Sequence, residues 1–347
     1  MLIQELRLNQ FRNYNKATIP FGEGLNIIVG NNGIGKTNIL ESIYLLSNTK
    51  SFRTSDDKKI IQQGNTYCAI EAVSEQGSIK AMINERGKTF YINNKIQKKT
   101  SDVIGKLHAI IFKPGDIELF SDSPKARRTE IDLELGKISK TYLQAIINYN
   151  HYLKQKNNLL KEKEIDMNLL SVLNDSLIPV ITTIIKEREE FINDINKFIS
   201  PIYKEMSGTN NEVKIFYEKC SDIDDVSINL ELAKEKDMVM QHSTFGPHKE
   251  DYTFYIDGHK IGDFASQGQK RMVIISLKLA IAKYVKTTTD NDALILLDDV
   301  LSELDRTRSE KLLNMLPYNQ IIITTTHIDQ LNIQKAYNLI ELEEQHA

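Results

Sequence analysis

The 347-residue sequence has only two cysteines, no tryptophan and no long apolar run. Cys68 and Cys220 form no Cys-x-x-Cys pair, which argues against a zinc site or a disulfide scaffold and suits a reducing compartment. No stretch approaches the roughly 18 apolar residues of a membrane helix, and the first residues lack the basic-then-apolar order of a signal peptide. We therefore expect a cytoplasmic protein with no membrane partner.

The sequence also lacks a large excess of either positive or negative residues. The formal net charge is −3, and the 41% hydrophobic and 26% charged residues are typical of a folded globular chain. The chain as a whole therefore has no electrostatic attraction for nucleic acid. Any DNA binding must come from local basic patches.

A glycine-rich motif, VGNNGIGKTNIL, occupies residues 29–40, and its central part matches the P-loop pattern G-x-x-x-x-G-K-[ST]. The almost wholly apolar run at residues 25–29 predicts a buried strand before the motif, and apolar residues at helical spacing predict a helix after it. In this order, loop amides and the helix N-terminus face a phosphate. We predict that nucleotide phosphates bind at Gly30, Asn31, Asn32, Gly33, Ile34, Gly35, Lys36, Thr37 and Asn38.

An acidic pair follows a second apolar strand, residues 293–297. A P-loop site needs a carboxylate for its magnesium ion at the end of a neighbouring strand. We predict that Asp298 binds Mg²⁺ together with the Thr37 hydroxyl, and that Asp299 orients or deprotonates the attacking water. The alternative is that the two acids only cap the following turn.

Two further segments become candidates for contact with the nucleotide when they are considered together with these motifs. Residues 266–269 (Ser266, Gln267, Gly268 and Gln269) precede a helical apolar pattern, where an anion is favoured, although such a segment alone is more often a simple cap. His327 follows the strand-like run 321–326 and could hydrogen-bond a γ-phosphate or the attacking water; a lone histidine there is more often structural.

The pattern between these motifs changes along the chain. Short β-type runs at about residues 60–120 predict hairpins, and residues 139–163 and 168–199 predict an antiparallel helical arm that Pro179 interrupts or kinks. We expect an ATPase head built from residues 1–125 and 241–347, with an arm at 126–240 inserted between. Along the arm, six lysines either track DNA phosphates or face solvent: 137, 140, 154, 156, 161 and 163.

Taken together, the motifs at 30–38, 266–269, 296–299, 302–305 and 325–327 resemble the ABC-type ATPase head shared with SMC proteins. Segments 11–14, 50–54, 112–120, 126–128 and 246–251 are similar to those of the RecF family, over nearly the whole chain. The resemblance implies an α/β fold: an ABC-type, SMC-like P-loop ATPase head with an inserted short α-helical arm.

The resemblance also implies a mechanism. Ser266, Gln267, Gly268 and Gln269 of one protomer would close over ATP and Mg²⁺ held by another, with Asp305 contacting across the interface and Arg12 and Asn13 near the adenosine side. Lys36, Asp299 and His327 would be the catalytic residues of a weak DNA-dependent ATPase. The implied partners are double-stranded DNA at single-strand gap junctions, RecR, RecO and indirectly RecA, with nucleoid association on DNA.

Several residues depart from the expected pattern. Asp299 stands where transporter-type heads have glutamate, which predicts slow turnover. Lys113 occupies the neighbourhood of the Q-loop glutamine, and Phe52 and Gly115 replace a more usual histidine and glutamate. Two alternatives remain: a non-hydrolysing nucleotide switch, and a transporter nucleotide-binding subunit. The latter needs a clear Q-loop and a surface for membrane helices, and the sequence displays neither.

Overall fold

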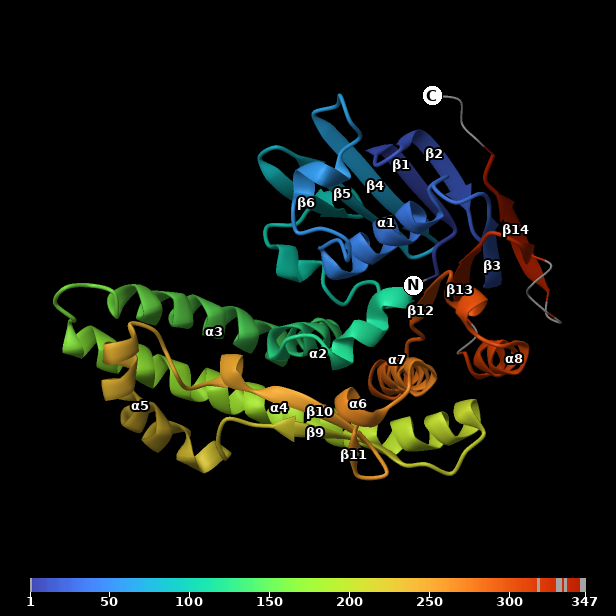
Figure 1. Cartoon of the computed structure of the whole chain (residues 1–347). Helices are drawn as coiled ribbons and strands as arrows, with labels where there is room; N and C mark the ends of the chain where they lie inside the picture. Colours follow the sequence, from blue (N-terminus) through green and yellow to red (C-terminus); the bar gives the residue numbers. More distant parts are fainter. Residues whose placement is uncertain (1, 317–318, 329–332, 334–335, 344–347) are drawn as a thin grey trace. The chain divides into compact units, whose positions relative to one another are not determined.

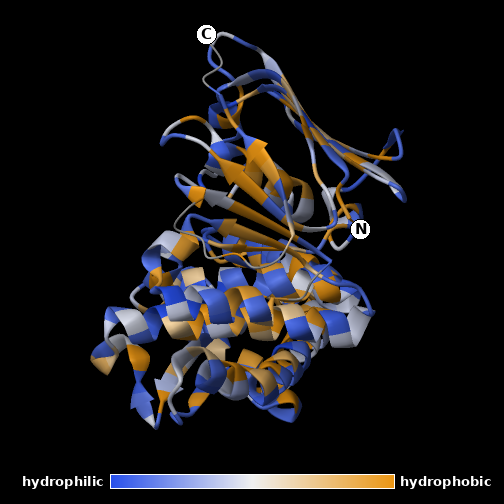
Figure 2. Ribbon diagram, turned by 90° about the vertical axis from the view of Figure 1, so that its right-hand side faces the viewer, coloured by the Kyte–Doolittle hydropathy of each residue, from blue (hydrophilic) through white to orange (hydrophobic). Residues whose placement is uncertain are grey.

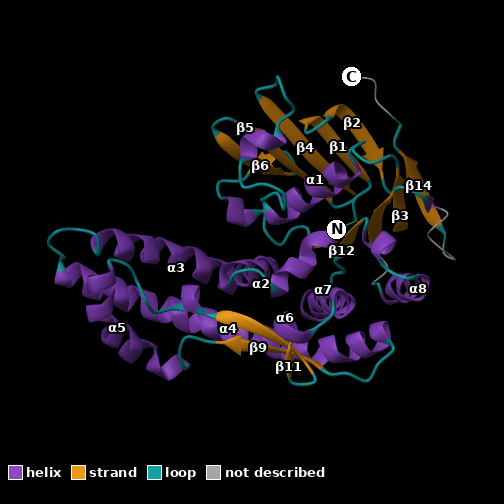
Figure 3. Cartoon of the chain, viewed as in Figure 1, coloured by secondary structure: helices purple, strands orange, loops and turns teal. Residues whose placement is uncertain are grey.

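The computed structural model describes residues 2–316, 319–328, 333 and 336–343 (Figure 1). The chain forms two compact units, each assembled from separate segments. We call the first, made of Met1–Asp116, Glu205–Thr209 and Ile274–Ala347, the head unit. The second, made of Ile117–Lys204 and Asn210–Val273, is the arm unit. Figure 3 shows the strand-rich head and the helix-rich arm by secondary structure.

A five-stranded sheet lies in the head unit, and each pair of neighbouring strands in it is parallel. In spatial order its strands are β14 (Tyr337–Glu341), β3 (Gly24–Val29), β13 (Gln320–Thr325), β12 (Leu294–Asp298) and β8 (Ala109–Phe112). Buried side chains fill β8, β12 and β13, as expected for parallel strands covered on both faces. The carboxyl ends of these strands therefore share one edge, where α/β proteins bind ligands.

A second, antiparallel sheet completes the head unit. Its strands, in spatial order, are β2 (Tyr14–Pro20), β1 (Glu5–Phe11), β4 (Tyr67–Ser74), β5 (Gly77–Asn84), β6 (Gly87–Ile92) and β7 (Lys95–Ile96). Burial alternates along β4, so one face turns to the core. Helix α1 (Lys36–Asn48) contacts strands of both sheets, and its apolar side chains join them in one hydrophobic cluster.

The head unit also contains shorter elements and part of a long helix. These are η1 (Asp57–Ile60), η2 (Thr100–Asp102), η6 (Val300–Glu303) and α8 (Arg306–Met315). Helix α7 (Gln267–Thr289) begins in the arm unit and continues in the head unit, and η3 (Pro114–Phe120) also crosses from one to the other.

The arm unit contains α2 (Pro124–Ile138), α3 (Lys140–Leu159), α5 (Val226–Met240) and most of α4 (Met167–Ser207). Figure 2 shows hydrophilic and hydrophobic residues mixed along the helices. A small antiparallel sheet joins them, with β11 (His259–Lys260), β10 (Asp251–Ile256) and β9 (Val213–Glu218) in spatial order. Short turns of helix complete the unit: η4 (Ile223–Asp225), η5 (Pro247–Lys249) and α6 (Ile261–Phe264).

Helix α4 runs without interruption through Pro179 and Pro201, so Pro179 does not interrupt it, and the alternative of a kink there stays a prediction. Pro179 is exposed, and water can satisfy the carbonyl that loses its partner there. Among the residues that the structure describes, α4 is the helix long and apolar enough, by length and composition, to cross a membrane. Its buried stripe nevertheless includes Arg188, which pairs with Asp132 and Glu250 inside the arm unit.

Candidate nucleotide-binding site

The P-loop connects the end of β3 to the first turn of α1. Gly33 and Gly35 have φ values of 84° and 120°, which glycine adopts without strain. A Cβ atom on Gly35 would also lie 2.6 Å from Tyr14 Oη and 2.8 Å from Asn13 Nδ2. Gly35 provides no side-chain cap to α1. Its carbonyl accepts from the Asn38 N–H (2.9 Å), and the two helix amides before Asn38 remain available to an anion.

Lys36 lies over the same loop. Its ammonium donates to the carbonyls of Gly30 (2.5 Å) and Asn31 (3.0 Å), and the residue is only 8% exposed. Burial lowers the pKa of Lys36, while Asp299 and Asp298 act in the opposite direction. The charge is therefore held inside the loop, where it can turn from the carbonyls to a phosphate.

Asp298 joins three elements at the shared sheet edge. Its Oδ1 accepts hydrogen bonds from Thr37 Oγ1 on α1 (2.8 Å) and Thr324 Oγ1 on β13 (3.0 Å). Burial raises the pKa of Asp298 more than these two hydroxyls lower it, so the carboxylate gains from a nearby cation.

A hydroxyl and a carboxylate side by side are the hard oxygen donors that Mg²⁺ prefers. In the described part of the chain, no three His, Cys, Asp or Glu side chains cluster as a complete metal site. A magnesium ion bound by one hydroxyl and one carboxylate would take most of its remaining ligands from water and nucleotide phosphates. Thr37 and Asp298 are the residues that would hold it.

Asp299 is placed differently from its neighbour. Its backbone N–H donates to Thr324 Oγ1 (3.1 Å), and its φ of 51° is unusual for a residue other than glycine. The side-chain Oδ1 is buried and has no hydrogen-bond partner among the described residues. A buried carboxylate oxygen without a partner is costly, and such groups concentrate at functional sites. Asp299 thus fits an acceptor for a reacting water.

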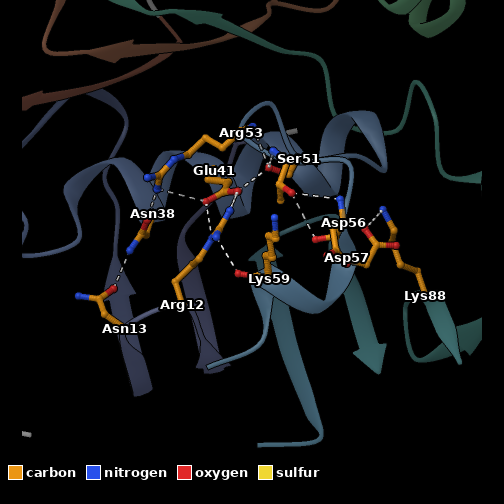
Figure 4. A network of polar contacts seen from close by, with 11 residues as sticks. Arg12, Asn13, Asn38, Glu41, Ser51, Arg53, Asp56, Asp57, Lys59 and Lys88 are labelled. Atoms are coloured by element: carbon orange, nitrogen blue, oxygen red, sulfur yellow. Dashed lines mark hydrogen bonds and ion pairs between the residues drawn. The ribbon is translucent and has the colours of Figure 1, made fainter. Parts of the chain in front are cut away.

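Arg12 and Asn13 belong to a polar network beside the P-loop (Figure 4). The Arg12 guanidinium binds both oxygens of buried Glu41 (2.9 and 2.5 Å), which also accepts from Ser51 Oγ (2.5 Å). Asn13 Nδ2 donates to the carbonyl of Ile34 (2.8 Å). Asn13 therefore braces the loop, while Arg12 is engaged by a carboxylate of α1; their role toward adenosine stays a prediction.

The other side of this network connects the predicted residue Asn38 with Arg53 and Glu41, which lie outside our predicted site. Asn38 Nδ2 donates to Asn13 Oδ1 (2.7 Å), and Arg53 donates to Asn38 Oδ1 (2.7 Å). Arg53 also lies 3.7 Å from Glu41. Sequence reasoning missed Glu41, although a single acid inside the apolar run ILESIYLL signals a buried charged partner.

The neighbourhood of the missing Q-loop glutamine contains an ion-pair cluster instead. Buried Lys278 on α7 donates to the carbonyl of Ile111 (2.6 Å) and lies 3.0 Å from Asp116. Lys113 lies 3.4 Å from the same carboxylate, with its ammonium 5.9 Å from the centre of the Phe52 ring. Asp116 thus organises the loop after β8; it lies in the RecF-like segment 112–120, but the sequence predicted no role for it.

His327 follows β13 at the sheet edge that carries Asp298. Its side chain is exposed, and its backbone N–H donates to Thr325 Oγ1 (3.3 Å). The exposed ring can approach a ligand at this edge, and its contact with a γ-phosphate stays a prediction.

The 266–269 segment lies in the arm unit at the start of α7. Ser266 N–H donates to Gln269 Oε1 (2.9 Å) and Gln269 N–H donates to Ser266 Oγ (3.3 Å), which is a capping box. Ser266, Gln267 and Gln269 are exposed, and a Cβ on Gly268 would meet nothing within 4 Å. The segment is therefore a cap and also an open helix N-terminus that another chain can reach.

Asp305 caps α8. Its Oδ1 accepts from the Arg308 N–H (2.9 Å), and its other oxygen lies 3.3 Å from the Arg308 guanidinium. Its side chain remains 54% exposed, so a contact with a second chain is sterically open. That contact stays a prediction.

Two of the six arm lysines are not on the surface. Lys137 pairs with Glu134 and Lys156 with Asp237, each at 2.8 Å, and both lysines are buried. Their assignment to DNA or to a solvent-facing surface is wrong, because acids in the folded arm neutralise them. The other four lysines are exposed: 140, 154, 161 and 163.

The parallel sheet with its P-loop and acidic pair, the antiparallel sheet beside it and the inserted helices define an ABC-type ATPase head of the SMC class, as predicted. The family model RecF/RecN/SMC N terminal domain matches residues 2–347. Two curated sequence relatives narrow this assignment.

The "DNA replication and repair protein RecF" of Streptococcus suis (strain 05ZYH33) is 38% identical over 345 residues, covering 96% of this chain and 94% of the relative. The protein of the same name from Streptococcus pneumoniae (strain ATCC 700669 / Spain 23F-1) is 37% identical over 344 residues, covering 95% and 94%. The chain belongs to the RecF family, which confirms the predicted resemblance.

Solved structures of similar proteins agree with this family assignment. The recombination mediator protein RecF bound to ATP, in the RecFOR pathway, has a TM-score of 0.90 at 29% identity, covering 98% of this chain and 97% of that one. An Smc head bound to the C-winged helix domain of ScpA has a TM-score of 0.55 at 17% identity, covering 94% and 89%, and shows the fold alone.

Proposed function

We propose that this protein is an ATP-dependent DNA clamp of recombinational gap repair, which dimerises on ATP and hydrolyses it slowly to release. The observation that carries the proposal is the hydrogen bond of 2.8 Å between Thr37 and Asp298, 261 residues apart. It unites the P-loop with the acidic strand end, as a nucleotide–magnesium site requires. The RecF structure that contains ATP supports the same ligand.

Within one protomer, Lys36 and the α1 amides bind the phosphates. Thr37 and Asp298 would hold Mg²⁺, and the ion would supply positive charge to the phosphate oxygens. Asp299 takes the attacking water with its unpartnered buried oxygen. The aspartate is one methylene shorter than the glutamate of transporter-type heads, so the water is held less closely. Slow hydrolysis follows.

A second protomer then provides the remaining groups that bind the γ-phosphate. The α7 N-terminus presents Ser266 and Gly268 on an open surface, and a helix N-terminus favours an anion. Two copies in a symmetric arrangement bury two ATP molecules between them, each bound by both chains. Nucleotide thus becomes a removable part of the interface, and its hydrolysis opens the dimer.

The partners follow from the family. The relatives are DNA replication and repair proteins, and the solved RecF structures belong to the RecFOR pathway. We infer double-stranded DNA at single-strand gap junctions, RecR and RecO as partners of this chain, and help in loading RecA. The protein acts in the cytoplasm, and on the nucleoid when it is bound to DNA.

Light scattering with and without ATP and gapped duplex DNA tests the proposal. Wild-type protein should double its mass with ATP and Mg²⁺. Lys36→Ala should lose both nucleotide binding and dimerisation, whereas Lys16→Ala, an exposed lysine of β2, should behave as wild type. Normal ATP-dependent dimers of Lys36→Ala would refute the proposed site.

The shared interface has its own test. Ser266→Arg adds bulk and charge to the exposed α7 cap, so it should leave ATP binding by the monomer intact while blocking the dimer. Ser227→Arg places the same side chain on the exposed first turn of α5 and serves as the matched control. If Ser266→Arg dimerises normally with ATP, the sandwich arrangement is excluded.

A further inference from the structure

Tyr14 carries a buried hydroxyl beside the P-loop. It is the first residue of β2 and is 4% exposed. Its Oη has no hydrogen-bond partner among the described residues. Two other buried tyrosines, Tyr142 and Tyr149, do have partners for their hydroxyls, a carboxylate and a histidine ring. A buried hydroxyl without a partner costs stability, so Tyr14 is a candidate for a role in binding rather than in folding.

The geometry around Gly35 shows where this hydroxyl lies. A Cβ atom on Gly35 would stand 2.6 Å from Tyr14 Oη and 2.9 Å from Tyr14 Cζ. The hydroxyl therefore faces the residue at which the P-loop enters α1. The two helix amides before Asn38, which remain available to an anion, belong to the same turn. The hydroxyl and the N-terminus of α1 are thus neighbours.

The chemistry of the hydroxyl indicates what kind of group it lacks. Burial raises the pKa of Tyr14 to about 12, so the hydroxyl keeps its proton and needs an acceptor for it. The adjacent Asn13 is engaged elsewhere, because its Nδ2 donates to the Ile34 carbonyl and its Oδ1 accepts from Asn38. Phosphate oxygens are acceptors, and a helix N-terminus is where they bind.

We propose that Tyr14 is a nucleotide-binding residue, whose hydroxyl donates a hydrogen bond to a phosphate oxygen, directly or through one water molecule. The proposal rests on the proposed function, which places a nucleotide at the P-loop. In this structure the Lys36 ammonium binds the carbonyls of Gly30 and Asn31. A phosphate that draws Lys36 away from them also reaches the turn at Gly35, where the hydroxyl waits without a partner.

This assignment predicts opposite effects on folding and on binding. Tyr14→Phe removes only the hydroxyl oxygen and keeps the buried ring. Without nucleotide, the variant loses an unsatisfied polar group and should be at least as stable as wild type. With nucleotide, it lacks a donor and should bind more weakly. A hydroxyl with a merely structural role would instead lower stability when removed and leave nucleotide affinity unchanged.

Tyr252 provides a matched control in the arm unit. It is 1% exposed, and its Oη also has no hydrogen-bond partner in the described part of the chain. Tyr252→Phe removes the same atom from β10, an element that carries no part of the P-loop. Urea unfolding without nucleotide measures stability. Titration calorimetry with Mg²⁺ and either ADP or a non-hydrolysable ATP analogue measures the affinity of each variant.

Tyr14→Phe should bind both nucleotides about 10-fold or more weakly, as expected for the loss of a hydrogen bond to a charged group. Its urea midpoint should equal or exceed that of wild type, and Tyr252→Phe should bind as wild type. Wild-type affinity of Tyr14→Phe, a lower stability of that variant, or an equal loss of affinity in Tyr252→Phe overturns the assignment. Normal nucleotide binding by Lys36→Ala would instead overturn the proposed nucleotide site itself.

Discussion

At the residue scale, two neighbouring carboxylates at the end of β12 have different surroundings. Asp298 accepts hydrogen bonds from two hydroxyl groups, whereas one oxygen of Asp299 is buried and has no hydrogen-bond partner in the described chain. The difference arises because β12 points Asp298 toward α1, while the chain turns at Asp299 with positive φ. Adjacent acids can therefore serve different purposes, one for a cation and one for water.

This division predicts the effect of Asp299→Asn. The amide cannot accept a proton from water, so hydrolysis should fall about 100-fold or more, while Asp298 keeps metal and nucleotide bound. The dimer should live correspondingly longer. Phosphate release and the decay of scattering after dilution measure the two effects.

Asp290→Asn, at an exposed site after α7, is the control and should not differ from wild type. If wild-type protein releases no phosphate and Asp299→Asn leaves the dimer lifetime unchanged, the protein is a non-hydrolysing switch.

A second residue-scale prediction concerns His248. Its Nε2 lies 3.0 Å from the Ser243 carbonyl oxygen, which can only accept a hydrogen bond, so the neutral ring carries its proton on Nε2. Its Nδ1 then accepts a hydrogen bond from the Tyr149 hydroxyl (2.5 Å). Burial lowers the pKa of His248 from 6.5 to about 4. Between these values the unfolded chain binds more protons than the folded one, so the free energy of unfolding falls as pH falls.

From pH 7 to pH 4 this histidine should remove about 3 kcal/mol of stability. Urea unfolding of wild type and His248→Gln over this range isolates the contribution, because the other titrating groups are common to both. The free energy of unfolding of wild type should approach that of His248→Gln as the pH falls toward 4. Parallel curves would show that His248 titrates normally.

The sequence predicted residues whose chemistry is local. The P-loop motif and the acidic pair were recognisable because a few neighbouring letters specify them. Glu41, Asp116 and Lys278 were missed because their partners are distant in sequence, and only the fold shows that Arg12 pairs with Glu41. Lys137 and Lys156 were misread for the same reason.

At the scale of elements, the periodicity of apolar residues predicted α1, α3 and most of α4, because an amphipathic helix has apolar residues at regular helical spacing. The extension of α4 through Pro201 was not predicted, since local preference disfavours proline while burial of Ile202 and Met206 favours the helix. Strands β9 and β10 lay outside the predicted arm pattern because their pairing partner is more than 30 residues away.

The connection between α3 and α5 yields an element-scale prediction. Lys156 and Asp237 form an ion pair with no exposed side-chain surface, and Asp237 also accepts from Thr244. Lys156→Met leaves the carboxylate buried without its cation and should destabilise the protein by about 3–5 kcal/mol. Chemical denaturation measures this change.

Asp237→Asn in the same chain removes the unpaired charge, so the double variant should recover most of the loss. Lys154→Met, an exposed lysine on the same helix, should change stability by less than about 0.5 kcal/mol. Simple additivity of Lys156→Met and Asp237→Asn would indicate that the two groups do not interact.

At the scale of the whole molecule, the order of motifs along the chain predicted an ATPase head assembled from both ends with an insertion between. The sequence placed the arm at 126–240, whereas the arm unit consists of Ile117–Lys204 and Asn210–Val273. Residues 251–256 pair with β9 on one side and with residues 259–260 on the other, which sequence patterns cannot show because strand pairing is a tertiary property.

Ligand linkage gives the whole-molecule prediction. ATP and Mg²⁺ at 100 times the dissociation constant should stabilise the folded chain by about 2.7 kcal/mol, which raises the melting temperature by several degrees. Dimerisation should add a second rise that depends on protein concentration. Scanning calorimetry at several protein concentrations separates the two.

Ser266→Arg should keep the first rise and lose the second, and Lys36→Ala should lose both. A concentration-dependent melting temperature in Ser266→Arg would contradict this scheme.

The distance along the chain between Thr37 and Asp298 also sets a time during synthesis. After Thr37, the ribosome adds 261 residues to reach Asp298, which takes about 13–50 seconds at about 5–20 residues per second. During this interval β3 has emerged without β13, its neighbour in the finished sheet. A truncated or stalled nascent chain therefore holds a P-loop without its carboxylate and cannot complete the site. The P-loop near the start of the chain therefore becomes functional only after the segment that contains Asp298 has been synthesised.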